Sequence, residues 1–136
     1  MTLRKYGFTL IEIMLVVIII TALAAMVVPR ISGRSEQAKI AIAKTDIANI
    51  ATALKIYELE NGNFPTSEQG LNALMKKPAN PPVPEVWNGP YIENPPTDPW
   101  GRTYVYVSPG EHRLDYDLSS KGKNDKSEDD DIVNWQ

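Results

Sequence analysis

Two groups of ionisable residues in this sequence could do chemistry. Glu12 stands alone in an otherwise uncharged apolar run, where an ionised carboxylate is costly and needs a partner. Near the carboxyl terminus five carboxylates crowd into residues 125–131. Like charges at that density repel one another, so they must either spread in solvent or gather on a cation. The five are Asp125, Glu128, Asp129, Asp130 and Asp131.

The residues alone leave both interpretations of the acidic segment open. The neighbouring lysines would partly balance the charge of a solvated, disordered tail, whereas the apolar residues Ile132 and Trp135 favour an ordered one. The chain has no cysteine. A small domain outside the cytoplasm therefore needs another staple, either contacts within an oligomer or a metal ion.

The composition gives no indication of a catalytic site. His112 is the only histidine, so neither a zinc site nor a nucleophile–base pair can be assembled around it. We expect His112 to be an exposed turn residue and the chain not to be an enzyme. The net charge of −3 also argues against nucleic acid as a partner, because phosphate binding needs a basic surface.

The apolar run that contains Glu12 extends from Phe8 to Val28 and has 21 residues. As a helix it would be about 30 Å long, the thickness of a bilayer core. It is longer than the apolar part of a secretory signal peptide, which favours a transmembrane helix. A plain single-pass anchor is the alternative interpretation. Basic residues flank both ends of the run, so the positive-inside rule does not decide its orientation.

The helical pattern continues beyond the apolar run. Pro29 removes a backbone hydrogen bond and predicts a point where the helix can kink or melt; the alternative is that the helix stops at Ser32–Gly33. Further on, apolar residues recur every three or four positions and form one helical face. Asn61–Gly62 is a typical helix end. The face consists of Ile40, Ala43, Ile47, Ile50, Leu54 and Tyr57.

The remaining residues, 63–136, predict short elements. Thr66 and Gln69 form a capping-box pattern that predicts a short helix ending near Lys77. A proline-rich loop covers 79–99, where Trp87, Tyr91 and Ile92 are expected to hold it to the body. The sequence Asp-Pro-Trp-Gly at 98–101 predicts a tight turn. Alternating residues predict strands at 103–107 and 114–118, joined through 108–111.

The motif Gly7-Phe8-Thr9-Leu10-Ile11-Glu12 resembles the processing site of type IV pilins and pseudopilins. The order of the later elements, with Asp-Pro-Trp-Gly and the acidic end before Ile-x-Asn-Trp, resembles major pseudopilins of the type II secretion system over essentially the whole chain. A type IV pilus subunit for adhesion or motility is the alternative, but such pilins usually carry a disulfide loop that this chain cannot form.

The resemblance implies how the chain is processed and divided. A prepilin peptidase would cut between Gly7 and Phe8 and methylate the new amino group of Phe8. Within a filament, the carboxylate of Glu12 would neutralise the amino terminus of a neighbour. Residues 1–7 would be the leader, 8–31 the transmembrane and filament-core helix, 32–62 its amphipathic continuation, and 63–136 a globular part in the periplasm.

The implied fold is α+β, with the long amino-terminal helix packed on a small antiparallel sheet. The implied function is to polymerise into a periplasmic pseudopilus that helps to export folded proteins across the outer membrane. Each subunit would first cross the inner membrane once. Its partners would be other copies of itself, prepilin peptidase, minor pseudopilins, the assembly platform and the membrane. The resemblance also implies Ca²⁺ in the acidic loop, which is not an EF-hand. The implied ligands are the carboxylates of Asp130 and Asp131, a side chain from Asn124 or Asp125, and the carbonyls of Lys121 and Lys126.

Overall fold

The structure, a computed structural model, describes residues 7–136, with only the backbone described at residues 28–32. The implied leader lies outside the described residues except for Gly7. The chain divides into two compact units, Met1–Gln37 and Ala38–Gln136. We refer to the second unit as the head.

Helix α1 extends from Leu10 to Asn61. It begins two residues later than the apolar run suggests, because Thr9 takes the capping position. Its backbone is helical through Pro29 and Gly33, so the helix does not stop at Ser32–Gly33. The side chain of Pro29, the predicted weak point, lies outside the described residues.

The predicted end of α1 is confirmed. Gly62 adopts a positive φ of 81°, which glycine reaches without steric cost. Its N–H donates to the carbonyl of Glu58 at 2.7 Å. The side chain of Asn61 donates to the carbonyl of Tyr57 at 2.8 Å. These two bonds satisfy carbonyls that a helix end leaves without partners.

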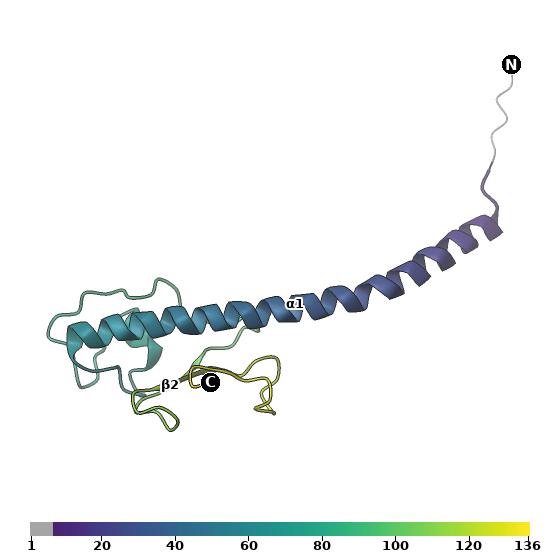
Figure 1. Cartoon of the computed structure of the whole chain (residues 1–136). Helices are drawn as coiled ribbons and strands as arrows, with labels where there is room; N and C mark the ends of the chain where they lie inside the picture. The colour runs from purple at the N-terminus through teal and green to yellow at the C-terminus, as the bar shows by residue number, and fades with distance from the viewer. Residues whose placement is uncertain (1–6) are drawn as a thin grey trace, which may run out of the picture. The chain divides into compact units, whose positions relative to one another are not determined.

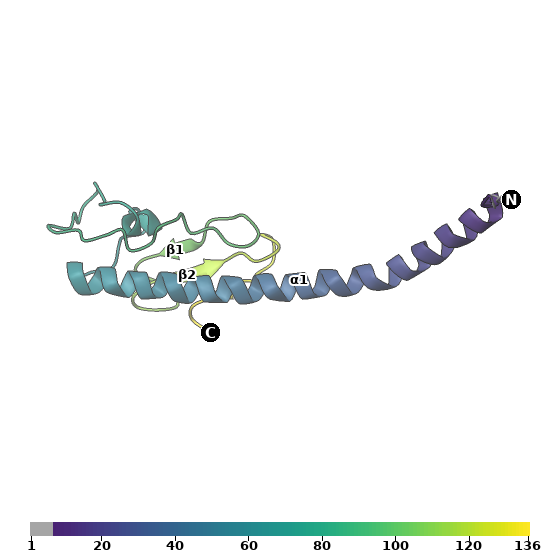
Figure 2. The same ribbon diagram turned by 90° about the horizontal axis from the view of Figure 1, so that it is seen from above.

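The apolar face of α1 packs against the rest of the head, as its spacing predicts. Figure 2 shows β1 and β2 beside the carboxyl-terminal part of the helix. Leu54 and Tyr57 are fully buried there. Ile40 is the exception, since it is 36% exposed and extends beyond the packed face. The core residues of α1 are Ala43, Ile47, Ile50, Ala53, Leu54 and Tyr57, and they meet Leu71, Leu74, Tyr104, Tyr116, Leu118 and Ile132 from the rest of the head.

The sheet has three antiparallel strands in the order β1-β2-β3, and the carboxyl terminus lies close to β2 (Figure 1). Strand β1 is Val105–Val107, β2 is Asp117–Ser120 and β3 is Ile132–Val133. The first is shorter than predicted, and Thr103 forms only an isolated bridge with Thr97. The third was not expected as a strand. It explains why the acidic segment ends in apolar residues, because Ile132 pairs with Ser120 and is buried.

The predicted strand at 114–118 is wrong in its first half. The carboxylate of Asp117 accepts hydrogen bonds from the backbone N–H groups of Glu111, His112 and Arg113 at 2.8–3.0 Å. The chain therefore folds back around Asp117 and cannot pair before it. Leu114, which the alternating pattern placed in a strand, is 96% exposed.

The short helix is confirmed, but it ends at Leu74 rather than near Lys77, and its type differs from the prediction. It is a 3-10 helix, η1, at Gly70–Leu74. The capping box forms, because the backbone of Thr66 donates to the Gln69 side chain and the backbone of Gln69 donates to the Thr66 hydroxyl. Gly70 then takes a positive φ of 58°, which prevents a continuous α-helix from following the cap.

Both predicted features of the following segment are confirmed. The Trp87 indole donates to the carbonyl of Ala73 at 3.1 Å, and Tyr91 packs edge-on against Tyr57. In the tight turn, the N–H of Gly101 donates to the carbonyl of Asp98 at 2.9 Å. The Asp98 side chain is 4% exposed and also accepts from the Ser120 hydroxyl at 2.6 Å. The turn is thereby tied to β2.

Candidate assembly and metal-binding sites

The amino-terminal site consists of Gly7, Phe8 and the first turn of α1. Gly7 and Phe8 lie before the helix, and Phe8 is 79% exposed. The backbone of Glu12 donates to the Thr9 hydroxyl at 3.2 Å, and the backbone of Thr9 donates to the Glu12 carboxylate at 3.4 Å. This is a capping box. The Thr-x-x-Glu spacing could have predicted it, but we interpreted Glu12 only as an assembly residue.

The first part of α1 is apolar on every side. The stretch Leu10–Val27 is long and apolar enough to cross a membrane, with a mean hydropathy of 2.9. None of it is buried within the described structure. Exposed apolar surface costs about 25 cal/mol per Å² in water, so this stretch must be covered by lipid or by other protein chains.

The carboxyl-terminal site is the acidic loop between β2 and β3. Pairing of Ser120 with Ile132 closes the two ends of the loop. The guanidinium of Arg102 donates to the carbonyls of Gly122 and Lys123 at 3.0 and 3.3 Å. The segment is therefore anchored, and the interpretation as a disordered tail does not fit the structure. Sequence reasoning missed Arg102, because nothing in its neighbourhood marks it as a loop anchor.

Five of the six residues implied as ligands contact one another, in two separate sets. Asn124 donates to both oxygens of Asp130, through its backbone at 3.0 Å and its side chain at 2.9 Å. The ammonium of Lys121 lies 3.5 Å from Asp131 Oδ2. The backbone N–H of Lys126 donates to the side-chain oxygen of Asn124 at 3.2 Å. Asp125 is exposed, and its carboxylate makes no hydrogen bond or ion pair with any described residue.

Two features of this loop bear on the predicted Ca²⁺ site, which stays a prediction. The Oδ1 atom of Asp131 is buried and has no hydrogen-bond partner among the described residues, and a buried carboxylate oxygen of that kind favours a positive charge. Gly122 has a positive φ of 61°, and a Cβ there would lie 2.3 Å from the carbonyl oxygen of Asp130. The backbones at Gly122 and Asp130 therefore lie close together across the loop. Over the described residues no three Asp, Glu or His side chains converge, so a Ca²⁺ ion would also need backbone carbonyls.

His112 is exposed, as predicted, but it is not a free turn residue. Its ring stacks on Trp135 with 4.2 Å between ring centroids and an interplanar angle of 5°. Its Nδ1 lies 2.9 Å from Asp117 Oδ2. The loop before β2 therefore holds the end of the chain beyond β3. A single histidine near a turn gives no sign of such a contact in the sequence.

Asp117 should make the stability of the head depend on pH. Burial acts to raise the pKa of its carboxyl, but hydrogen bonds from His112, Arg113 and Glu111 outweigh burial and lower the pKa to about 2. An unfolded Asp titrates near 3.9. The unfolded chain thus binds more protons between these values, and the contribution of Asp117 is complete above pH 4 and is lost as the pH falls towards 2.

This pH dependence can be measured as the urea midpoint of unfolding from pH 5 to pH 2. Asp117→Asn should be less stable at pH 5 and lose less of its stability on acidification. Asp115→Asn removes an exposed carboxylate two residues away and should titrate as the unmodified chain does. Parallel curves for Asp117→Asn and the unmodified chain would show that Asp117 does not carry the effect.

The exposed apolar stretch Leu10–Val27 is compatible with a membrane anchor, and its helix continues into a small α+β head, a combination typical of pilin-like subunits. Residues 30–135 match the family model for "Type II secretion system (T2SS), protein G", and residues 2–28 match the "Prokaryotic N-terminal methylation motif". The chain therefore belongs to the type II secretion system protein G family. The protein G match favours a pseudopilin over the alternative of a type IV pilus subunit.

Individual relatives agree with this assignment. The chain is 50% identical to type II secretion system core protein G of Pseudomonas aeruginosa, over 97% of this chain and 96% of the relative. It is 45% identical to the protein of the same name from Escherichia coli K12, over 97% and 92%. The crystal structure of the major pseudopilin from enterohaemorrhagic Escherichia coli superposes with a TM-score of 0.67 at 36% identity, over 76% of this chain and 92% of that one. These matches confirm the predicted family and fold.

Proposed function

We propose that this chain is the major structural subunit of a type II secretion pseudopilus, and that it acts by polymerising rather than by catalysis. The observation that carries the proposal is the complete exposure of Leu10–Val27. A helix that is apolar all round is buried in its working environment. Lipid supplies that environment before assembly, and the same helix of neighbouring copies supplies it afterwards.

Processing prepares the helix for this exchange. Cleavage between Gly7 and Phe8 by a prepilin peptidase would create an α-ammonium at Phe8, which is then methylated. Glu12 lies in the first turn of α1, and among the described residues its carboxylate accepts a hydrogen bond only from the Thr9 backbone, at 3.4 Å. In a filament it would neutralise the amino terminus of the next copy, because neither charge is stable alone in an apolar environment.

The cellular arrangement follows from the same segment. The apolar helix would cross the inner membrane once, with the leader in the cytoplasm and residues 63–136 in the periplasm. Minor pseudopilins and the assembly platform of the secretion system would contact the growing filament, which helps folded proteins to cross the outer membrane.

The acidic loop would hold Ca²⁺ between β2 and β3. Asp130 and Asp131 would supply carboxylates, Asn124 a side-chain oxygen, and Lys121 and Lys126 carbonyls. The unpartnered Oδ1 of Asp131 supports this assignment. Asp125 would join them only if the loop rearranged, because it is exposed and its carboxylate makes no hydrogen bond or ion pair with any described residue. Bound Ca²⁺ would join the ends of a head that has no disulfide.

Complementation tests the proposed function. A secretion-competent bacterium that lacks its own major pseudopilin would receive this chain, and export of a folded reporter enzyme into the medium would be measured. We expect export to return, and filaments containing the chain to be recovered after shearing. Filaments without export of the reporter would show that the chain assembles but does not support secretion. Cells that process the chain but give neither filaments nor export would contradict the proposal.

A further inference from the structure

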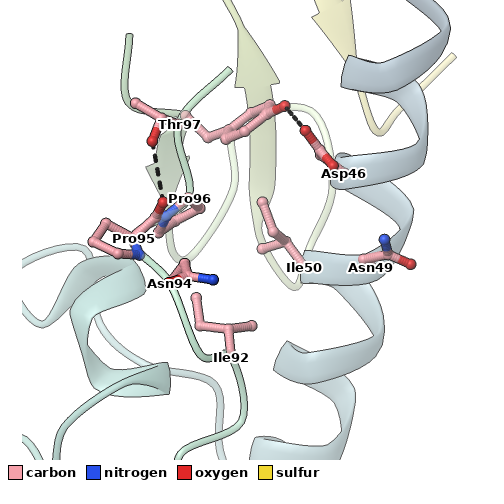
Figure 3. Close-up of a pocket in the computed structure, with 9 residues that line it drawn as sticks. Asp46, Asn49, Ile50, Ile92, Asn94, Pro95, Pro96 and Thr97 are labelled. Carbon is pink, nitrogen blue, oxygen red and sulfur yellow. Dashed lines mark hydrogen bonds between the residues drawn. The ribbon is translucent and has the colours of Figure 1, made fainter. Parts of the chain in front are cut away.

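A small pocket lies between α1 and the end of the proline-rich loop (Figure 3). Its volume is 210 Å³, which is below the usual range of about 300–1,000 Å³ for pockets that hold small-molecule ligands. It has room for the end of one side chain. Asp46, Asn49 and Ile50 line it from α1, and Tyr104 and residues 94–97 line it from the other side.

The chemistry of this pocket suits a cation. Asp46 Oδ2 accepts the hydroxyl of Tyr104 at 2.9 Å (Figure 3). Desolvation of Tyr104, together with this bond to Asp46, raises the pKa of its hydroxyl. The phenol therefore stays a donor and fixes the carboxylate. Asn49 and Asn94 add amide groups at the rim. No basic side chain of the described residues lines the pocket or forms an ion pair with Asp46.

The same chain carries a suitable cation on the other flank of α1. Lys44 precedes Asp46 by two residues, which corresponds to about 200° around the helix axis. Lys44 is exposed and lies on the groove that borders residues 129–131, yet it forms no ion pair with any described residue. A cation on one flank and an acceptor on the opposite flank make a contact that repeats from copy to copy without closing, as a helical filament requires.

We propose that this pocket receives the Lys44 ammonium of the adjacent copy and fixes the register between heads. The proposal rests on the proposed function, because it needs filaments. It gives the head a polar contact of its own, separate from the apolar association of the amino-terminal helices.

Cysteine cross-linking tests the contact, since the chain has no cysteine of its own. The double variant Lys44→Cys/Asn94→Cys would be expressed with the secretion system and exposed to an oxidant. We expect a ladder of disulfide-linked multimers in the filament fraction. The matched control, Lys55→Cys/Asn94→Cys, places an exposed cysteine three turns further along α1 and should give no ladder. Filaments of normal yield without a ladder from the first pair would overturn the proposal.

Charge exchange tests the energetics. Asp46→Asn keeps an acceptor for Tyr104 but removes the charge, and we expect about threefold fewer filaments, as for the loss of one partly exposed ion pair per contact. The exchange Lys44→Asp/Asp46→Lys should recover filaments relative to Lys44→Asp alone. If both variants unfold at the same temperature as the unmodified head and filament yield does not recover, the proposed contact between Lys44 and the pocket is wrong. If the unmodified chain itself formed no filaments, the proposed function would be contradicted instead.

Discussion

Replacing Glu12 with Gln should abolish filaments while leaving cleavage and membrane insertion intact. Gln at this position still completes the capping box with Thr9, so the helix start is preserved and only the charge is lost. Removing one partner of a desolvated ion pair costs about 3–5 kcal/mol, which corresponds to a hundredfold or greater loss of assembly. The measurement is the amount of the chain in sheared filaments relative to the membrane fraction.

Glu12→Ala provides the matched comparison, because it removes the cap as well as the charge. If charge pairing is the reason for Glu12, both variants lose filaments to a similar extent. If Gln supports normal filaments and Ala does not, the capping box observed in the structure is the role of Glu12. Loss of insertion in either variant would indicate a simpler anchoring role.

Removing Ca²⁺ should lower the unfolding temperature of the head by roughly 10–20 °C. A ligand present at about a hundred times its Kd stabilises the folded state by about 2.7 kcal/mol, and 1 kcal/mol shifts Tm by about 4–8 °C in a domain of this size. The measurement is thermal unfolding of the full chain in detergent micelles, with Ca²⁺ and with a chelator. The chelated head should also be cleaved faster by protease.

Two alanine variants show whether the effect comes from the acidic loop. Asp131→Ala removes the carboxylate with the buried, unpartnered oxygen and should eliminate the response to Ca²⁺. Asp125→Ala removes an exposed carboxylate of the same segment and should keep it. If Ca²⁺ shifts the unfolding temperature of both variants equally, its binding depends on general surface charge. If Ca²⁺ does not shift the unfolding temperature of the unmodified chain, the ligand assignment is wrong.

Structural features were predicted most accurately from the sequence where a short pattern of residues can adopt only one local structure. The apolar face of α1, its end at Asn61–Gly62 and the Asp98–Gly101 turn are confirmed because each depends on local spacing or on glycine conformation. The membrane-compatible stretch is likewise set by composition alone. These features need no knowledge of which distant residues meet.

Some features leave no sign in the local pattern of residue types. The predicted strand at 114–118 is wrong in its first half because Asp117 binds three backbone N–H groups only four to six residues earlier, which alternation cannot indicate. The other two missed features depend on distant contacts. β3 is only two residues long and exists because β2 offers a free edge. The anchoring of the acidic loop by Arg102 joins residues twenty positions apart. Such contacts come from tertiary structure rather than from local pattern.

The most direct test of the central claim is mass spectrometry of the chain in purified, sheared filaments. We expect a mature subunit that begins at Phe8 with a methylated amino group, and filaments built mainly from that species. The precursor should remain in the membrane fraction when the peptidase is absent. Filaments that contain the uncut chain, or a mature chain that never leaves the membrane in cells with an intact secretion system, would contradict it.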